Sequence, residues 1–565
     1  MSARSSRRHI ALLGVLSGLG AGGVLLGLNP GSLSPLSSLR LVGGAGLAGL
    51  LLSAPFALWP RRARPERPSR PFWLLVAAAG LALGLLAESQ RVLYHAFLPN
   101  GSRRVLVACA FAGLLAGLVS GAAVLWPPRE ITSVRLLALL AALFGLAPFA
   151  GRRDAGPMTP LSSGDPVSGT TSRSLLVVGL EGVSWELLSQ WASDGSLPTF
   201  ARMMKEGVSG PLEPQRPYDR VALWTTAATG KRPAKHGLAS EVRYRTPLGT
   251  LRLLPRPFGL GAPERLPLST TEPVPGSERR SLAFWEILAA RGHQVAVLSW
   301  PGADPARPGL LLWATERLFS VEPGPVPGLP EETAARAALF RAEPGTLEGS
   351  LVASLLPGEL PAADREAARP LDGAARDLSV TGAALASVPV GPRSVVALVL
   401  SGLVPLAERF GPAAPVGPTH WGLAVPDTEA RARALLSYYR FLDDVLADLL
   451  EREGRDRTFC VFAPAGWGPP GPLAAFSRFA RGRAPVSVPD GSAGGFVILV
   501  GTGIRSAARL TSASVYDLAP TLLVLTGEPM ARDFDGRVLA EAFDERFARS
   551  TSLPIVTTFE PGGPQ

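Results

Sequence analysis

Five apolar stretches follow one another in the first 150 residues, and they constrain the fold more than any other feature. They span residues 10–28, 41–59, 72–87, 105–126 and 136–150. A helix needs about 20 residues to cross the hydrocarbon core of a bilayer, and about 17 is the usual lower limit. Three stretches exceed that limit and two fall just short of it. We therefore predict about five transmembrane helices; the alternative is a set of buried helices in a soluble protein.

The first stretch follows Arg4, Arg7 and Arg8, as the apolar part of a secretory signal peptide would. A cleaved signal peptide is not expected to be followed by four further spans. We predict that this helix is retained in the protein.

Charge and cysteine content exclude several classes of protein. The first 165 residues hold 16 arginines, no lysine and five acidic residues, so their net charge is +11, and the other 400 residues, with 40 basic and 41 acidic side chains, sum to −1. The excess positive charge therefore belongs to the membrane segment, and no basic stripe remains for nucleic acid. The two cysteines, Cys109 and Cys460, are too few for a disulfide scaffold or a cysteine-rich metal site.

The arginines are also distributed unevenly between the loops, which predicts an orientation. Residues 60–71 hold five arginines, whereas residues 88–104 hold three. Because Lys and Arg concentrate in cytoplasmic loops, we expect the N-terminus and the loop at residues 60–71 inside the cell and, after five crossings, the C-terminal part outside. We divide the chain into a membrane domain (1–151), a Pro-, Gly-, Ser- and Thr-rich linker (152–173), a soluble domain (174–550) and a tail (551–565).

The soluble domain alternates short runs rich in β-branched residues with helical segments, which predicts an α/β fold with a mostly parallel sheet. The expected strands are 174–180, 294–300, 394–400, 458–462 and 495–500. The expected helices are 198–206, 281–291, 427–452, 515–525 and 537–547. In such sheets the chemistry lies beyond the carboxyl ends of the strands.

Five sequence blocks carry a resemblance. They are 177–185 (VVGLEGVSW), 198–207 (PTFARMMKEG), 224–237 (WTTAATGKRPAKHG), 284–301 with its FWEIL and WP ends, and 517–536 with DLAPTLL and DFDG. In this order they resemble the alkaline phosphatase superfamily, in its type I phosphodiesterase/nucleotide pyrophosphatase branch. The resemblance spans nearly all of 174–547 and implies that family's α/β sandwich. It also implies two divalent metals held by carboxylates and imidazoles, with a Ser or Thr nucleophile.

The positions that the resemblance assigns to this chemistry are mostly substituted. The first Asp ligand falls at Glu181, and the nucleophile falls at Arg220, which has no attacking oxygen and is preceded by Asp219. The next ligand pair falls at Val404 and Glu408.

The last ligand positions are also changed. The Asp–His pair after the fourth strand falls at Pro464 and Ala465, and no histidine lies shortly before residue 495. Val, Pro and Ala side chains offer no lone pair to a hard cation. We predict a pseudoenzyme without a metal cofactor, or with a single Zn or Mn ion if activity remains.

The leading hypothesis is a membrane-anchored extracytoplasmic domain that binds or scaffolds without hydrolysis. Its expected partners are the bilayer and either a phosphorylated headgroup or an envelope protein, in a bacterial inner or plasma membrane. Arg220, with Glu181 and Glu408 nearby, is the candidate binding group, because a guanidinium pairs with phosphate through two hydrogen bonds. The competing interpretation is a structural ion pair of Arg220 with Asp219, Glu181 or Glu408.

Two other hypotheses stay open. A residual hydrolase or headgroup phosphotransferase would need a reduced metal site and a new nucleophile; the candidate groups are Glu181, Asp219, Glu408 and His420 for the metal, and Thr225, Thr226 or Ser184 for the attack. A transporter or channel is disfavoured because the spans hold almost no ionisable residue. Asp443 and Asp444 look like a metal pair, but neighbouring helix residues point to different faces, so we expect one to be solvated and the other to make a helix contact.

Overall fold

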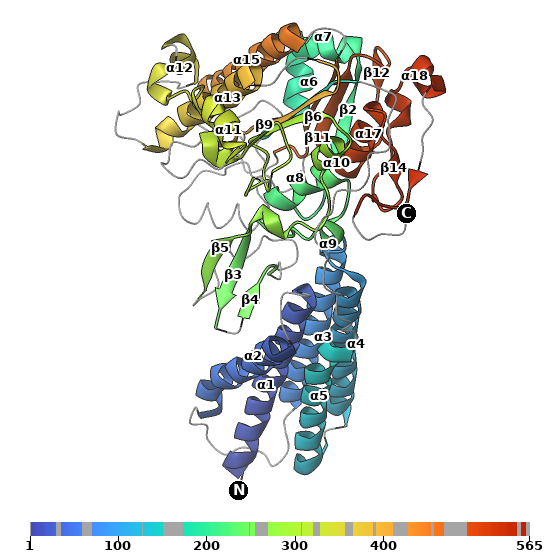
Figure 1. Ribbon diagram of the computed structural model, residues 1–565. Coiled ribbons are helices and arrows are strands. Elements are labelled where there is room, and N and C mark those ends of the chain that lie inside the picture. Colours follow the sequence, from blue (N-terminus) through green and yellow to red (C-terminus); the bar gives the residue numbers. More distant parts are fainter. Residues whose placement is uncertain are drawn as a thin grey trace. The chain divides into compact units, whose positions relative to one another are not determined.

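The computed structural model describes most of the chain (Figure 1). The described residues are 2–29, 35–58, 70–126, 128–150, 173–247, 249–254, 269–306, 308–319, 328–347, 349–355, 365–387, 391–410, 428–453, 457–467, 494–550 and 555–560. The chain forms two compact units, which we call the helical unit (residues 1–157 and 239–274) and the α/β unit (158–238 and 275–565).

The helical unit contains the five predicted apolar helices. They are α1 (Ser2–Leu28), α2 (Pro35–Leu58), α3 (Arg70–Leu93), α4 (Asn100–Leu125) and α5 (Glu130–Ala150). All five are long and apolar enough to cross a membrane, which agrees with the prediction from the apolar stretches. Small residues let the helices approach closely: a Cβ on Gly49 of α2 would lie 2.0 Å from the carbonyl oxygen of Gly14 in α1.

The helical unit also includes a small sheet that the sequence patterns did not predict. Its strands are β3 (Val242–Thr246), β4 (Gly249–Leu251) and β5 (Thr270–Pro273), which pair antiparallel in the order β4-β3-β5. Residues 239–274 therefore interrupt the sequence of the α/β unit, although sequence analysis places them within one continuous soluble domain.

The α/β unit is built on a ten-stranded sheet with the order β12-β2-β11-β10-β1-β9-β6-β7-β8, in which β13 also pairs with β2. Its strands are β1 (Leu175–Leu180), β2 (Val208–Glu213), β6 (Gln294–Leu298), β7 (Leu312–Ala314), β8 (Gly328–Leu329), β9 (Ser394–Leu400), β10 (Thr458–Ala463), β11 (Gly495–Val500), β12 (Ala508–Arg509) and β13 (Ala513–Ser514). The central strands β10, β1, β9, β6 and β7 run parallel, which confirms the predicted α/β class.

Helices cover both faces of this sheet (Figure 1), because successive side chains of each strand point to opposite faces. In β1, Leu176 and Val178 join one buried apolar cluster, while Leu175 and Val177 join another. The first cluster includes residues of α6 (Trp185–Ser193), α7 (Pro198–Glu206), α11 (Glu331–Ala338), α12 (Gly349–Leu355), α13 (Arg365–Ser387), α14 (Val404–Phe410) and α15 (Thr428–Glu453). The second includes residues of α8 (Arg220–Thr229), α10 (Phe284–Ala290), α17 (Leu518–Leu525) and α18 (Glu545–Ser550).

Two details of the predicted α/β fold are wrong. Strand β11 is antiparallel to β10, although its buried apolar run predicts a parallel strand. Periodicity alone does not distinguish the two directions, because a strand buried on both faces is apolar throughout in either case. The single helix expected over residues 537–547 is instead a 3-10 turn (Ala540–Ala542) followed by α18.

Candidate functional site

The carboxyl ends of three neighbouring strands form the candidate site. Strands β10, β1 and β9 are adjacent and parallel, so the residues that follow them lie at one edge of the sheet. Glu181 follows β1 directly, and its backbone N–H donates to the carbonyl oxygen of Leu400, the last residue of β9. This edge is where the sequence predicts the site.

The next residue of the β1 turn lies close to Val404 and Trp467. Gly182 has φ +89°, a left-handed conformation that glycine adopts without strain. A Cβ at this position would lie 3.3 Å from the backbone nitrogen of Val404 and 3.3 Å from Nε1 of Trp467. Pro464 and Ala465, which follow β10, are buried.

Arg220, the first residue of α8, lies between two carboxylates. Its Nε and Nη2 donate to the two oxygens of Glu181 at 2.7 and 2.9 Å. Its Nη2 and Nη1 also donate to the two oxygens of Glu316 at 2.5 and 3.3 Å. Glu316 begins the short 3-10 turn after β7. The three side chains form a network with a net charge of −1, which we call the Arg220 network.

Burial on its own lowers the pKa of Arg220, but the charges and hydrogen bonds of Glu181 and Glu316 outweigh this effect. The pKa of Arg220 is therefore raised well above the usual value for arginine. The guanidinium stays charged at every physiological pH. Arg220 pairs with Glu181, one of the three partners that the sequence suggested, and with Glu316, which the sequence did not suggest.

Two of the other candidate groups cap helices. The side chain of Asp219 accepts a hydrogen bond from the backbone N–H of Ala222 at 3.0 Å and caps the N-terminus of α8. Ser184 caps α6, since its hydroxyl oxygen accepts a hydrogen bond from the backbone N–H of Leu187 at 3.5 Å. Both contacts serve the start of a helix, because the first backbone N–H groups of a helix lack partners within it.

The two candidate threonines are buried inside α8, with relative exposures of 2% for Thr225 and 0% for Thr226. The hydroxyl of Thr226 donates to the side-chain oxygen of Gln215 at 2.5 Å and lies 3.1 Å from Nε2 of His236. Burial is the main cause that lowers the pKa of His236 to about 3, so this histidine is neutral. Leu238 N–H donates to its Nδ1, so His236 has a structural role in the turn within the sequence block 224–237.

The residues at this edge do not fit the two-metal centre that the resemblance implies. Among the residues that the structure describes, no three His, Cys, Asp or Glu side chains come together in a group that could hold a metal ion. Both oxygens of Glu181 already accept hydrogen bonds from Arg220, and Val404, Pro464 and Ala465 have no ligating side-chain atom. His420 lies outside the described residues.

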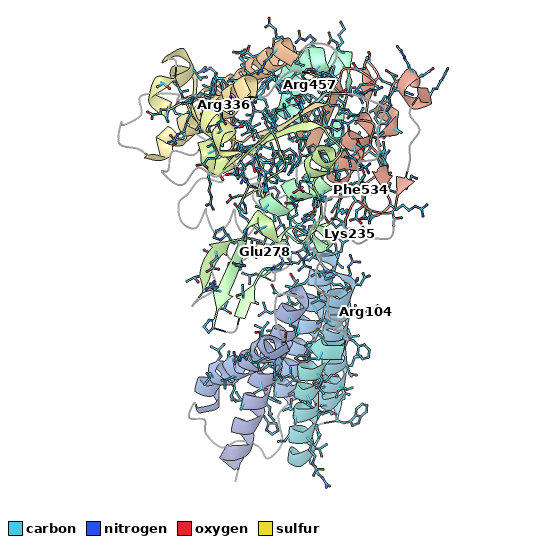
Figure 2. All side chains as sticks on the ribbon, in the orientation of Figure 1. Arg104, Lys235, Glu278, Arg336, Arg457 and Phe534 are labelled. Carbon is cyan, nitrogen blue, oxygen red and sulfur yellow. The ribbon has the colours of Figure 1, made fainter. Side chains whose placement is uncertain are left out.

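The basic turn at residues 231–235, which we call the signature turn, is held by acidic residues near the C-terminus. Lys231 Nζ lies 2.6 Å from an oxygen of Asp533 and 2.7 Å from an oxygen of Glu560. Asp535 accepts from Arg232 at 2.8 Å and from Lys235 at 2.9 Å. Lys235 is labelled in Figure 2, together with Phe534 between the two aspartates. These signature residues therefore stabilise the fold by joining distant segments.

The aromatic signature residues are also structural. Trp224, Trp285 and Trp300 are at most 2% exposed and form edge-to-face contacts in the core. The indole N–H of Trp300 donates to the carbonyl oxygen of Trp224 at 3.2 Å. A Cβ on Gly179 of β1 would lie 2.5 Å from the ring of Trp224, so the strand needs glycine here to admit the ring.

Residues 175–461 match the family model of the type I phosphodiesterase/nucleotide pyrophosphatase family. The chain belongs to this family. The match covers 287 of 565 residues and confirms the resemblance carried by the sequence blocks. No curated protein matches the chain.

Solved structures of this superfamily are similar at low identity. They include alkaline phosphatase PafA (12% identity, TM-score 0.43, covering 66% of this chain and 99% of that one). Murine ectonucleotide pyrophosphatase/phosphodiesterase 5 is similar at 11% identity, with a TM-score of 0.33 and coverage of 63% and 95%. A phosphonate monoester hydrolase from Silicibacter pomeroyi is similar at 14% identity, with a TM-score of 0.37 and coverage of 65% and 76%.

Proposed function

We propose that this protein is a catalytically degenerate member of its family, anchored in the plasma membrane of a bacterium with the α/β unit outside the cytoplasm, and that it acts as a scaffold for an envelope protein. The observation that carries the proposal is the Arg220 network. A guanidinium stands where the family motif requires an attacking hydroxyl, and it binds the carboxylate that the motif assigns to a metal.

The chemistry of the residues at this edge of the sheet supports the proposal that the protein does not hydrolyse phosphodiesters. Attack on phosphorus requires an oxygen, and Arg220 has only nitrogen donors that stay protonated. The other candidate nucleophiles are committed elsewhere: Ser184 caps α6, and Thr226 is fully buried. A metal ion at Glu181 would have to displace a two-point ion pair.

The charge of the Arg220 network favours a protein partner over a phosphorylated headgroup. A phosphate would approach a network whose net charge is −1, and it would compete with Glu181 and Glu316 for the same guanidinium. Neither carboxylate is free to leave without losing its charge-assisted hydrogen bonds. A scaffold role does not require either carboxylate to be displaced from Arg220.

The location rests on the helices and their arginines. Five helices of sufficient length and hydropathy support anchoring. The five arginines at residues 60–71 support a cytoplasmic side for that loop, and three further crossings support the opposite side for the chain after the fifth helix. Cysteine accessibility labelling in intact cells, with a single cysteine introduced at exposed Thr271 of a Cys-free protein, tests this orientation.

Metal analysis and turnover test the degenerate site. The purified full chain in detergent should hold no stoichiometric Zn or Mn and should not hydrolyse an aryl phosphodiester with either ion added. An active member of the family, purified in parallel, is the positive control. Stoichiometric metal with turnover that the Arg220→Met variant changes would show an active enzyme instead.

Calorimetry separates the two kinds of partner. Titration of the full chain with inorganic phosphate and with glycerol phosphate should release no binding heat. Saturable heat that disappears in the Arg220→Met variant would support the headgroup hypothesis and overturn the scaffold. For the scaffold itself, in-cell crosslinking from a photoreactive residue at exposed Leu339 should give a discrete protein adduct; only lipid adducts would contradict it.

A further inference from the structure

Residues 239–274 leave the α/β unit and return to it, yet they belong to the helical unit. They carry the small sheet of β3, β4 and β5 and begin two residues after Gly237. Both ends of this segment are thus covalently joined to the α/β unit. We call residues 239–274 the docking insertion.

A buried asparagine at the end of α1 binds the backbone of the docking insertion. Asn29 is 1% exposed, and its Nδ2 donates to the carbonyl oxygen of Leu253 at 2.9 Å. Its Oδ1 accepts from the backbone N–H groups of Arg252 and Leu253 at 2.5 and 2.9 Å. One side chain therefore satisfies three backbone groups that are more than 220 residues away in the sequence.

A second polar contact comes from Tyr94, the residue that follows α3. Its hydroxyl, on a side chain that is 3% exposed, donates to the carbonyl oxygen of Leu254 at 3.0 Å. The residues that follow α1 and α3 thus bind three consecutive residues of the insertion, Arg252, Leu253 and Leu254. Buried backbone groups need such partners, because leaving them unpaired costs free energy.

Apolar contacts complete the interface. Leu251 and Leu254 are 2% and 3% exposed and share one buried cluster with three residues of α1 and α2. Those residues are Leu26, Leu41 and Val42. Tyr244 of β3 lies against the same cluster. The face of the insertion that meets the helices is therefore apolar, whereas Thr270 and Thr271 of β5 are exposed.

We propose that the docking insertion is a second attachment of the α/β unit to the membrane helices, in addition to the linker at residues 152–173. Within the helical unit, the insertion is held to the helices by buried hydrogen bonds and apolar side chains. The partner of this surface is the end of the bundle formed by α1, α2 and α3 in the same chain. The attachment does not depend on whether the family's chemistry is retained.

Cleavage of the linker tests the proposal in the full chain. A specific protease site is inserted between residues 158 and 172, and an affinity tag is placed at the N-terminus. The protein is cleaved in mild detergent, the helices are captured through the tag, and the C-terminal fragment is measured in the bound and unbound fractions. Most of this fragment should remain bound, because residues 239–274 still hold it. Complete release from the otherwise unchanged protein would overturn the proposal.

Matched variants assign the retention to the interface. The Asn29→Ala and Leu251→Ala substitutions together, or Tyr94→Phe with Leu251→Ala, should release several-fold more of the cleaved fragment. Thr271→Ala, on the exposed side of the same insertion, should release no more than the parent. The urea midpoint of tryptophan fluorescence, dominated by the core of the α/β unit, should stay unchanged in every variant, which separates loss of attachment from unfolding. Equal retention in all variants would overturn the assigned contacts.

Discussion

Replacing Arg220 with methionine tests the central structural claim about the candidate site. Methionine keeps an unbranched apolar stem but removes the charge that binds Glu181 and Glu316. The side chain of Glu181 is 8% exposed, so the variant leaves a nearly buried carboxylate unpaired. Removing one partner of a buried ion pair costs about 3 to 5 kcal/mol. Because the side chain of Glu316 is 33% exposed and keeps its hydration, we expect the lower end, about 3 kcal/mol at pH 7.

The stability difference between the parent and Arg220→Met is the free energy of leaving the Glu181 carboxylate, 8% exposed, without its guanidinium partner.

Urea unfolding followed by tryptophan fluorescence measures this difference, because Trp224 and Trp300 are buried in the α/β core. The double variant Arg220→Met with Glu181→Gln removes both charges and should recover much of the loss. Arg336→Met is the control, since Arg336 forms an exposed pair with Glu332 at 3.9 Å and should change the free energy of unfolding by less than about 0.5 kcal/mol. A loss below about 1 kcal/mol in Arg220→Met, or a double variant as unstable as the single one, would refute the reasoning.

Three further predictions concern the fold. Gly179→Ala places a Cβ 2.5 Å from the buried ring of Trp224 and should lower the free energy of unfolding in urea by about 1 to 3 kcal/mol. Gly391 has open space around it, so Gly391→Ala should lower it less. Equal effects would contradict the contact with Trp224. Asp443 accepts hydrogen bonds from two backbone N–H groups at the start of α7, so Asp443→Ala should lower the free energy of unfolding by about 1 to 2 kcal/mol. Asp444 is exposed, and Asp444→Ala should have little effect. The reverse order of the two effects would be inconsistent with this cap. The pKa of His236 falls from 6.5 to about 3 on folding, so the free energy of unfolding should decrease as the pH is lowered from 6.5 to 3, by up to about 1.4 kcal/mol per pH unit. The His236→Gln variant should show a weaker pH dependence. Identical pH profiles for the parent and the variant would argue against a neutral buried histidine.

Much of the fold is predictable because the strands and helices carry local signals. The apolar stretches predict the five helices, and the β-branched runs predict β1, β6, β9, β10 and β11 as strands. The direction of β11 depends on its neighbours and not on its own residues. The docking insertion is also invisible in the sequence, since Asn29 and Leu253 are 224 positions apart and no periodicity links them.

Some residues of the candidate site are likewise predictable from the sequence, and others are not. Glu181 and Arg220 could be placed because they stand at fixed positions within sequence blocks, and their ion pair was among the expected alternatives. Glu316 could not be placed, because it follows the three-residue strand β7, which is too short to show a pattern. The expected contrast between Asp443 and Asp444 is confirmed: Asp443 caps α7 and is 2% exposed, while Asp444 is exposed.

Residues that match the family motif and residues that differ from it affect the stability of the fold in different ways. Retained signature residues, such as Trp224, Lys231 and Asp535, fill the core or join distant segments, so losing them would destabilise the fold. Metal-ligating carboxylates contribute in the opposite sense, because several anions at one edge repel one another unless cations offset them. Under the proposed degenerate function, a chain without the metals must lack those anions or pair them with cations. Val404 carries no charge at one such position, and Arg220 pairs with Glu181 at another, so both residues are consistent with the proposal.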